Sequence, residues 1–354
     1  MQIYCKFCGA TNLSTSGGGI LCRRCGHLLE MEDQKEDYHL QNGTILHQVY
    51  RVVALLGEGG FGITYKAYDE QTARLVAIKE LYSKDIVRRN VRYSVDVALA
   101  YDIHTDDYEK TKKRFIEEAK ALMQFRGEQG IVQILDFFEE NNTAYLVTEY
   151  LEGRTLKEYL KQSGALPWEK AYRLLCPVME SLGRIHEKGV IHRDISSANM
   201  MMVKEEKLVL LDFGAFKTIP QDTFTNTSIF AKRGYTPIEQ YSGNDEIGTW
   251  TDVYALTAVF YECVTGEMPP DSLQRVVYDE YQTMRAKGYP VPQGIEEICS
   301  KGLAIHVADR FRDMPDLMMA FEARIRVKPK KKSLFLWIGL ILVLLLIGIL
   351  AVVF

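Results

Sequence analysis

The sequence lacks internal repeats and long low-complexity tracts, which excludes a repeat array. It also lacks a strong charge excess: the net charge of -4 and the pI near 6.0 give no indication of a nucleic-acid-binding body. Nothing at its start has the pattern of a signal peptide, so its seven cysteines are expected in reducing cytosol. The composition is otherwise that of a globular protein, and 354 residues are enough for two lobes plus extra segments.

Four of the cysteines form two Cys-x-x-Cys pairs near the start, each followed by a glycine: Cys5 with Cys8, and Cys22 with Cys25. Each pair can form a tight turn that points two thiolates at one tetrahedral Zn²⁺. A module this short cannot bury enough apolar surface to fold alone, so metal binding would supply the missing free energy. We interpret residues 1–28 as a structural zinc ribbon; redox-active or disulfide-forming dithiols are the alternative.

Two further segments flank the main body of the chain. Residues 29–47 begin with an acidic stretch that has almost no apolar periodicity, so they are predicted to be a linker. Residues 334–354 are an uninterrupted apolar run, which as a helix would span about 30 Å, the hydrocarbon thickness of a bilayer. The lysines of residues 328–333 should keep that side cytoplasmic and attract anionic lipid. We therefore expect a single-pass anchor in the cell membrane, with the body of the chain in the cytoplasm and no extracellular domain.

The central stretch of the sequence reads HRDISSAN over residues 192–199 and LDFG over residues 211–214. Two short apolar runs around a charged tetrapeptide lie between them and predict a β-hairpin. A hairpin returns the chain to its starting point, so Asn199 and Asp212 should emerge side by side at its open end. An amide oxygen and a carboxylate held there suit Mg²⁺ that still carries phosphates. Asp194, a few residues upstream, could accept a proton from an incoming hydroxyl.

A glycine-rich turn, GEGGFG over residues 57–62, follows a strand-like stretch. Glycines there let backbone N–H groups approach phosphates without side-chain clash. A strand follows this turn rather than a helix, which disfavours a Rossmann or P-loop interpretation. Thr64, two positions after the last glycine, is β-branched and can pack on adenine. The candidate nucleotide-contacting residues are Gly57, Glu58, Gly59, Gly60, Phe61, Gly62 and Thr64.

The next predicted strand ends at a lysine. Period-two alternation puts Ala77 and Lys79 on one face, where the small alanine leaves room for a base and the lysine reaches phosphates. Taken alone, Lys79 would more often be an ordinary exposed lysine at a strand end, but its position decides against that interpretation. A buried lysine needs a carboxylate partner. Glu118 borders the apolar stripe of the following helix, while Glu117 points away, so we assign Glu118 as that partner. The sequence gives no physical account of the polar insertion at residues 85–107.

These motifs, in this order and at these separations, resemble the catalytic core of the bacterial-type Ser/Thr protein kinases over residues 48–327. The resemblance implies an α+β fold with an N-lobe (48–151) and a C-lobe (152–327). It implies transfer of the ATP γ-phosphate to Ser/Thr hydroxyls of proteins, including the chain itself. The roles that it implies are a base at Asp194, Mg²⁺ ligands at Asn199 and Asp212, and a phosphate-fixing pair of Lys79 and Glu118.

The same resemblance assigns several supporting residues. Residues 144–153 would be the hinge between the lobes, with backbone atoms at Glu149 and Leu151 bonding adenine and Thr148 gating the pocket behind it. Asp252 would clamp the backbone of the catalytic loop, although a simple helix cap is the alternative. The resemblance also implies a buried pair of Glu239 and Arg310.

Two features depart from the family pattern. Ser196 stands two residues after Asp194, where Ser/Thr kinases usually carry a lysine that touches the γ-phosphate. Residues 231–239 also lack the usual Ala-Pro-Glu. Lys79, Mg²⁺ and Asp194 would remain to support transfer, so one lost cation should slow the reaction without abolishing it.

The segment after residue 214 is rich in hydroxyls. Arg193 often receives an activation-loop phosphate in this family, and four candidate acceptors cluster in that loop: Thr223, Thr225, Thr227 and Ser228. We predict autophosphorylation there; a merely polar loop is the alternative.

Two other functional classes compete with an active kinase. One is a nucleotide-binding pseudokinase scaffold that recruits partners through its zinc ribbon, for which Ser196 is the only support. The other is a zinc-ribbon nucleic-acid binder with a kinase appendage. Our expectation is an ATP-dependent kinase with protein substrates and a bilayer as partners and no nucleic acid; the sequence does not indicate an oligomeric state.

Overall fold

The computed structural model describes residues 2–5, 7–13, 20–29, 36–60, 62–100, 104–204, 207–211, 232–241 and 247–326. Several predicted features lie outside these residues. They are Phe61, Asp212, the hydroxyl cluster at 223–228, the basic segment 328–333 and the apolar run 334–354. Among the described helices, none is long and apolar enough to cross a membrane.

The N-lobe is built on one antiparallel sheet in the order β11-β12-β8-β7-β6-β5. Its strands are β5 (Ile45–Leu46), β6 (Tyr50–Gly59), β7 (Gly62–Asp69), β8 (Arg74–Leu81), β11 (Ile134–Glu140) and β12 (Thr143–Glu149). Strand β8 alternates as predicted, with Val76 and Ile78 buried and Ala77 and Lys79 half-buried. One helix, α1 (Thr105–Met123), packs its apolar face on this sheet, and Glu117 is exposed as expected.

The predicted linker is shorter than its assigned range. Residues 45–46 form the edge strand of the N-lobe sheet, and Leu40 and Leu46 are completely buried in its core. The sequence interpretation erred because two-residue strands carry no detectable periodicity. The N-lobe therefore begins well before residue 48.

The C-lobe is mainly helical. Its helices are α2 (Leu156–Ser163), α3 (Trp168–His186), α4 (Thr249–Thr265), α5 (Ser272–Val277), α6 (Gln293–Gly302) and α7 (Met314–Arg326). Helix α4 is buried along nearly its whole length, as its apolar sequence predicts. Helix α3 runs through Pro177 as one element.

A small sheet of β13 (Gly153–Thr155), β14 (Met200–Val203) and β15 (Lys207–Leu210) lies on the C-lobe next to the hinge. Strands β14 and β15 pair from Met200 with Leu210 to Val203 with Lys207, so the predicted hairpin is confirmed.

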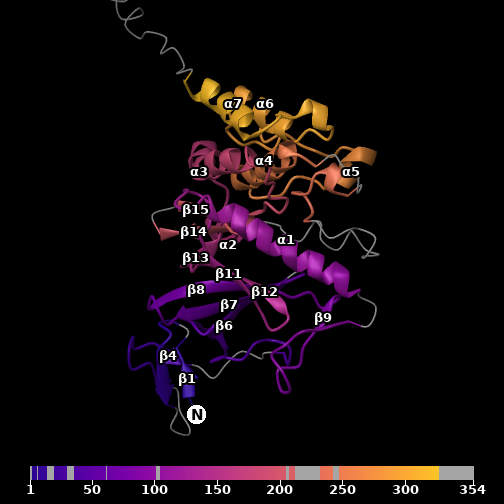
Figure 1. Cartoon of the computed structure of the whole chain (residues 1–354). Helices are drawn as coiled ribbons and strands as arrows, with labels where there is room; N and C mark the ends of the chain where they lie inside the picture. Colours follow the sequence, from indigo (N-terminus) through magenta and orange to yellow (C-terminus); the bar gives the residue numbers. More distant parts are fainter. Residues whose placement is uncertain are drawn as a thin grey trace, which may run out of the picture.

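Four short strands make up the cysteine-containing module: β1 (Gln2–Tyr4), β2 (Thr11–Leu13), β3 (Ile20–Leu21) and β4 (Leu28–Leu29). Figure 1 shows this module at one end of the molecule, beside β6 and β7, and α3, α4, α6 and α7 at the opposite end. An Arg24–Tyr68 hydrogen bond of 3.1 Å and an Arg51–Thr11 bond of 2.8 Å hold it against the N-lobe.

Candidate active site

The catalytic loop is held by one carboxylate from helix α4. Asp252 is fully buried, and its oxygens accept hydrogen bonds from the backbone N–H groups of His192 (2.8 Å) and Arg193 (2.9 Å). His186 Nε2 lies 2.8 Å from the same carboxylate. Burial alone would raise the pKa of Asp252, but the hydrogen bonds and charges of His186 and His192 together outweigh it and lower that pKa. The clamp implied by the family resemblance is therefore present.

This clamp also holds an unusual backbone conformation. Arg193 has a φ of 62°, a value that residues with a Cβ rarely adopt. The cost of such a conformation is of order 1–3 kcal/mol, and the surrounding bonds must over-determine it. The bond from Arg193 N to Asp252 does so, together with the bond that Gln240 Nε2 donates to the Arg193 carbonyl at 3.0 Å.

Asp194 and Asn199 lie together at the open end of the hairpin. The Asn199 amide nitrogen donates to the backbone carbonyl of Asp194 at 2.9 Å and to its carboxylate at 2.7 Å. Since the nitrogen makes these bonds, the amide oxygen is the atom suited to a cation. Leu211 N donates to the Asn199 carbonyl at 2.8 Å, so the hairpin brings the chain back beside Asn199 one residue before Asp212. The Asn199 amide oxygen, with the carboxylate of the predicted partner Asp212, would suit a hard divalent cation.

A cation reaches Asp194 from residue 232, to which the sequence analysis assigned no role. Lys232 Nζ lies 3.0 Å from the Asp194 carboxylate and 3.2 Å from Ser196 Oγ. No local motif marks Lys232. The only signal that could have found it is the missing lysine at position 196.

A buried network beneath the loop joins it to the same segment. Tyr235 and Ser197 donate to the two carboxylate oxygens of Glu262 at 2.5 and 3.1 Å, and their hydroxyls lie 2.9 Å apart. Burial raises the pKa of Glu262. This network was also missed, because its three members are far apart in sequence.

The glycine-rich turn lies against Lys79. Strands β6 and β7 pair up to Gly59 and Gly62, as the predicted strand–turn–strand requires, and Thr64 is the register partner of Lys79. A Cβ on Gly62 would lie 2.7 Å from the Glu80 carbonyl and 3.2 Å from Lys79 Cε. Only glycine fits this close approach, so the turn can cover the lysine.

One residue of the turn is held from outside it. Glu58 accepts a bond from Tyr38 at 3.0 Å, lies 3.0 Å from His39 Nε2 and pairs with Lys84 at 2.7 Å. Its side chain is therefore directed to the segment at 36–47. Any contact of Glu58 with a nucleotide in this conformation would come from its backbone.

The predicted pair of Lys79 and Glu118 is not closed in this conformation. Among the ion pairs between described residues, which have N···O distances of at most 4.0 Å, none joins Lys79 to Glu118. Burial raises the pKa of Glu118 to about 7, and the positive charges of Arg193, Arg114 and Lys79 only partly oppose this rise. Helix geometry correctly predicted that Glu118, not Glu117, lies on the inner side of α1. The distance from Glu118 to Lys79 on β8 is set by the packing of the helix on the sheet, which periodicity does not report.

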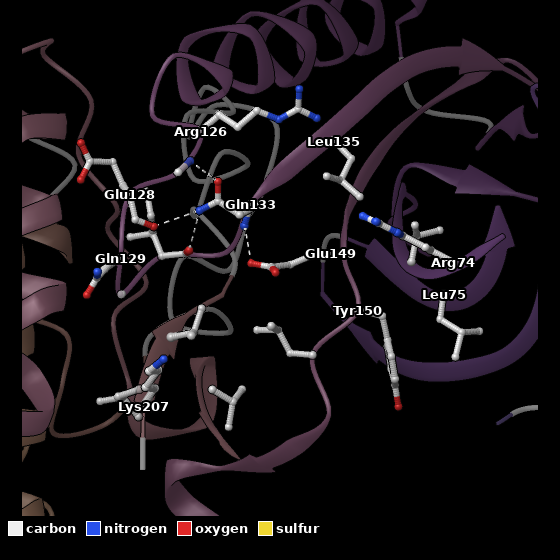
Figure 2. A pocket seen from close by; sticks show the side chains of 18 of the residues that line it. Arg74, Leu75, Arg126, Glu128, Gln129, Gln133, Leu135, Glu149, Tyr150 and Lys207 are labelled. Carbon is white, nitrogen blue, oxygen red and sulfur yellow. Dashed lines mark hydrogen bonds between the residues drawn. The ribbon is translucent and has the colours of Figure 1, made fainter. Parts of the chain in front are cut away.

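Two hydrogen bonds to Gln133 hold Glu149 at the predicted hinge. Glu149 N donates to the Gln133 carbonyl, and Gln133 N donates to the Glu149 carboxylate, both at 3.0 Å. Thr148 Oγ1 lies 3.4 Å from the Glu149 carbonyl. Figure 2 shows Glu149 and Tyr150 at the wall of a cavity of about 1430 Å³. Its lining includes Leu151 but not Lys79, Asp194 or Asn199, so it is separate from these predicted catalytic residues.

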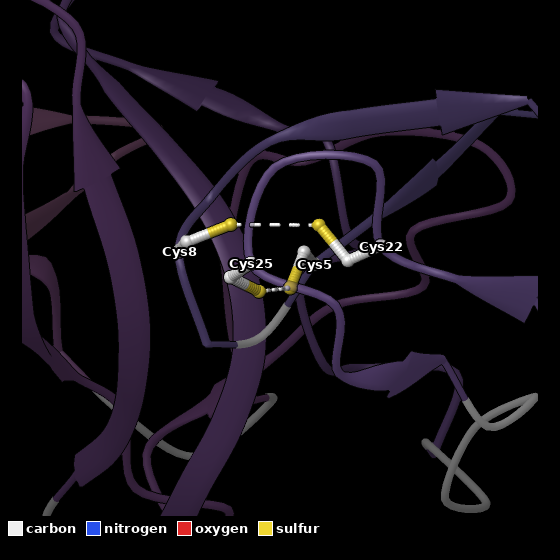
Figure 3. Close-up of side chains that lie close together, drawn as sticks. All are labelled: Cys5, Cys8, Cys22 and Cys25. Atoms are coloured by element: carbon white, nitrogen blue, oxygen red, sulfur yellow. Dashed lines mark hydrogen bonds between the residues drawn. The ribbon is translucent and has the colours of Figure 1, made fainter.

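The four N-terminal cysteines converge as predicted. Their sulfur atoms all lie within 4.8 Å of one another (Figure 3). Both turns have the same form, with Gly9 N donating to the Cys5 carbonyl and Gly26 N to the Cys22 carbonyl, at 2.8 Å each. Both glycines have positive φ, of 70° and 73°, which relieves the backbone at the turn. The four cysteines are not joined by disulfides, and a tetrahedral set of thiolates fits Zn²⁺.

Comparison with known proteins agrees with this geometry. The model of the protein kinase domain family matches residues 50–311. The chain belongs to the protein kinase family. Similar curated proteins include the probable serine/threonine-protein kinase CPE1738 of Clostridium perfringens, 33% identical over 64% of this chain and 30% of that protein. The serine/threonine-protein kinase PrkC of Bacillus subtilis is 30% identical over 77% of this chain and 41% of its own length.

Solved structures agree as well. The kinase domain is similar to the PpkA-294 apo form, with a TM-score of 0.70 and 32% identity over 80% of this chain and 99% of that one. The structure of Rad53 1-466 in complex with AMP-PNP, at 17% identity and a TM-score of 0.57, shares the fold. This chain spans less than half the length of the curated relatives that it matches.

Proposed function

We propose that this chain is an ATP- and Mg²⁺-dependent protein kinase that transfers the γ-phosphate to serine and threonine hydroxyls of proteins. The observation that supports it most is the arrangement of Asp194 and Asn199 under the Asp252 clamp, at the open end of the β14–β15 hairpin. The family match and the bacterial serine/threonine-protein kinases among its relatives support the same reaction.

The side chains divide the work by position. Asp194 would accept a hydrogen bond from the substrate hydroxyl, orient it and take its proton as the phosphoryl group moves. Lys79 would bind the α- and β-phosphates under the turn at 57–62. Asn199 and Asp212 would hold Mg²⁺, which neutralises phosphate charge when bound. Positioning and charge stabilisation, rather than covalent chemistry, would supply the rate.

Transfer of labelled phosphate to protein tests the proposal. The wild type should incorporate label, and Asp194→Asn and Asp212→Asn should each reduce the rate by at least about 100-fold. Equal incorporation by all three proteins would point to a contaminating kinase and favour the pseudokinase scaffold. Phosphoamino-acid analysis of the product separates serine and threonine from tyrosine acceptors.

The N-terminal module is proposed to hold one structural Zn²⁺ through Cys5, Cys8, Cys22 and Cys25. The convergence of four sulfurs and the two matching turns support a closed four-thiolate site. His27 Nδ1 lies 3.3 Å from Cys25 Sγ, which suits a hydrogen bond to a ligand rather than a fifth ligand.

The apolar run at 334–354 is proposed to anchor the kinase in the cell membrane, with the kinase domain on the cytoplasmic side. The support is its length, its lack of charge and the lysines before it. Expression of the full chain and of a chain ending at Val327 tests it. The full chain should sediment with membranes and resist high salt, while recovery of both proteins in the soluble fraction would contradict the anchor.

Autophosphorylation between residues 212 and 239 is proposed as a route of activation. It is supported by Arg193, a cation beside the base, and by the four hydroxyls at 223–228. Mass spectrometry of the active enzyme after incubation with ATP tests this idea. An active enzyme without phosphate in that range would exclude it.

A further inference from the structure

The catalytic loop lacks a positive side chain where phosphoryl transfer is expected to need one. Negative charge on the transferring phosphoryl group is stabilised by fixed cations near the attacking oxygen. Ser196 is neutral and completely buried, with an extended backbone, so it cannot supply that charge. A kinase with this loop needs a cation from another part of the chain.

Lys232 is placed to supply it. Of the cations in the described part of the chain, Lys232 is the one whose side chain pairs with Asp194, at 3.0 Å. It also bonds Ser196 Oγ at 3.2 Å, so the serine directs the ammonium group toward the base. The lysine side chain is 34% exposed and that of Asp194 is 21% exposed, so both remain accessible to a ligand.

The position of Lys232 is fixed by buried structure. Its backbone N–H donates to Thr236 Oγ1 at 3.0 Å, and its carbonyl accepts from Tyr235 N and Thr236 N, which closes a tight turn. Tyr235 in that turn and Ser197, the neighbour of Ser196, bind the same buried carboxylate of Glu262. The network therefore keeps the turn and the catalytic loop in register, and the Lys232–Ser196 contact does not depend on a chance rotamer.

We propose that Lys232 is the catalytic cation of this kinase, touching the γ-phosphate in place of the lysine that the loop lacks at position 196. This assignment rests on the proposed kinase function. It also makes catalysis depend on the turn at 232–236, because the charge of Lys232 reaches Asp194 only when that turn is docked on Glu262.

Moving the charge back to the loop tests the assignment. Lys232→Met, which keeps the length of the side chain, should lower kcat by about 100-fold while the ATP KM changes by less than about threefold. Ser196→Lys in the Lys232→Met background should recover at least about tenfold of that loss. Arg233→Met, which removes an exposed cation from the adjacent residue, should leave kcat within about twofold of the wild type. Thermal unfolding of each protein shows whether the variant is folded.

Each other outcome overturns the assignment. Equal kcat for Lys232→Met and Arg233→Met would show that the ammonium group is not used. A higher kcat for Lys232→Met would show that Lys232 instead blocks the base. A loss that Ser196→Lys does not recover would mark a structural role. Absence of Asp194-dependent transfer by the wild type would overturn the proposed function and this assignment together. If the wild type is active and only the Lys232 results differ from expectation, the assignment alone fails.

Discussion

The catalytic loop depends on one buried side chain, because Asp252 satisfies two backbone N–H groups that would otherwise be buried without an acceptor. These two bonds fix the direction of His192 and Arg193, and they compensate for the positive φ of Arg193. A polar group buried without a partner costs about 1–3 kcal/mol. The Asp252 carboxylate therefore stabilises the catalytic loop by more than a helix cap would.

Asp252→Asn should expose this dependence. The amide offers only one acceptor atom, so a backbone N–H would face an NH₂ group, and the free energy of unfolding should fall by about 2–3 kcal/mol. Urea denaturation measures the change. Asp309→Asn removes a charge from an exposed site and should change stability by less than about 0.5 kcal/mol. Equal effects of the two changes would contradict the clamp.

Glu118 should make stability depend on pH. Its pKa of about 7 lies above the value of 4.5 for a solvated glutamic acid, so the folded state binds more protons than the unfolded state between these values. Stability should therefore fall as pH rises through this window, by roughly 1–3 kcal/mol from this group. Glu118→Gln should remove that part of the pH dependence, as measured by urea denaturation at pH 5 and pH 8.

Glu117 is the matched control for this experiment, because it is exposed on the same helix. Glu117→Gln should retain the wild-type pH dependence. Glu118→Gln should also lower kcat/KM, since the variant cannot form the ion pair with Lys79 expected in the closed conformation. The same pH slope in both variants would contradict the raised pKa.

Among the elements, the insertion at 85–107 acquires a role that its sequence did not reveal. The insertion contains β9 (Val87–Arg88) and β10 (Ala98–Leu99), which pair with each other. Arg89 makes two bonds to the Glu80 carboxylate, at 2.5 and 2.8 Å, and both side chains are completely buried. Arg89 Nε also donates to the Tyr38 carbonyl at 2.8 Å, so the insertion ties the segment at 36–47 to strand β8.

Removal of the arginine should leave a buried charge without a cation. Tyr65 and Tyr145 still donate to Glu80, at 3.1 and 2.9 Å, but they do not neutralise it. Arg89→Met should therefore lower the free energy of unfolding by about 3–5 kcal/mol. Arg88→Met, at the exposed neighbouring position, should change it by less than about 0.5 kcal/mol. Chemical denaturation of both variants measures the change. Equal effects of the two substitutions would show that the insertion only covers the sheet and does not stabilise it through Arg89.

The elements also show which contacts a sequence can predict. The hairpin, the alternation of β8 and the facing of Glu118 follow from local periodicity, and the cysteine turns follow from spacing. The Asp252 clamp and the Glu239–Arg310 pair, which is buried with distances of 2.6 and 3.0 Å, came from family resemblance. Lys232, Arg89 and Glu262 were missed because their partners lie on other elements, and no period or spacing reports such contacts.

At the scale of the whole molecule, the cysteine module packs on the N-lobe as an extension of it and is not a separate domain. The Arg24–Tyr68 and Arg51–Thr11 bonds place it on β6 and β7, the two strands that carry the glycine-rich turn. Loss of the module's structure should therefore reach the nucleotide-binding lobe.

Metal removal tests this coupling. A zinc chelator should release about one zinc per chain and lower the Tm of the N-lobe, because apo modules of this kind do not stay folded. Cys22→Ser should reproduce both effects without chelator. Cys176→Ser, a change outside the cluster, should retain the zinc and the Tm. A wild type that contains no zinc, with a Tm unchanged by chelator, would contradict the zinc-ribbon interpretation.

The central claim is that Lys79, Asn199 and Asp212 together bind the triphosphate and its Mg²⁺. A crystal structure of the full chain with Mg²⁺ and a non-hydrolysable ATP analogue measures this most directly. Our account predicts phosphates under the turn at 57–62, with Lys79 Nζ bonded to them and closed on Glu118. An analogue bound in the cavity of about 1430 Å³ beside the hinge, with no contact to Lys79 or Asn199, would contradict it.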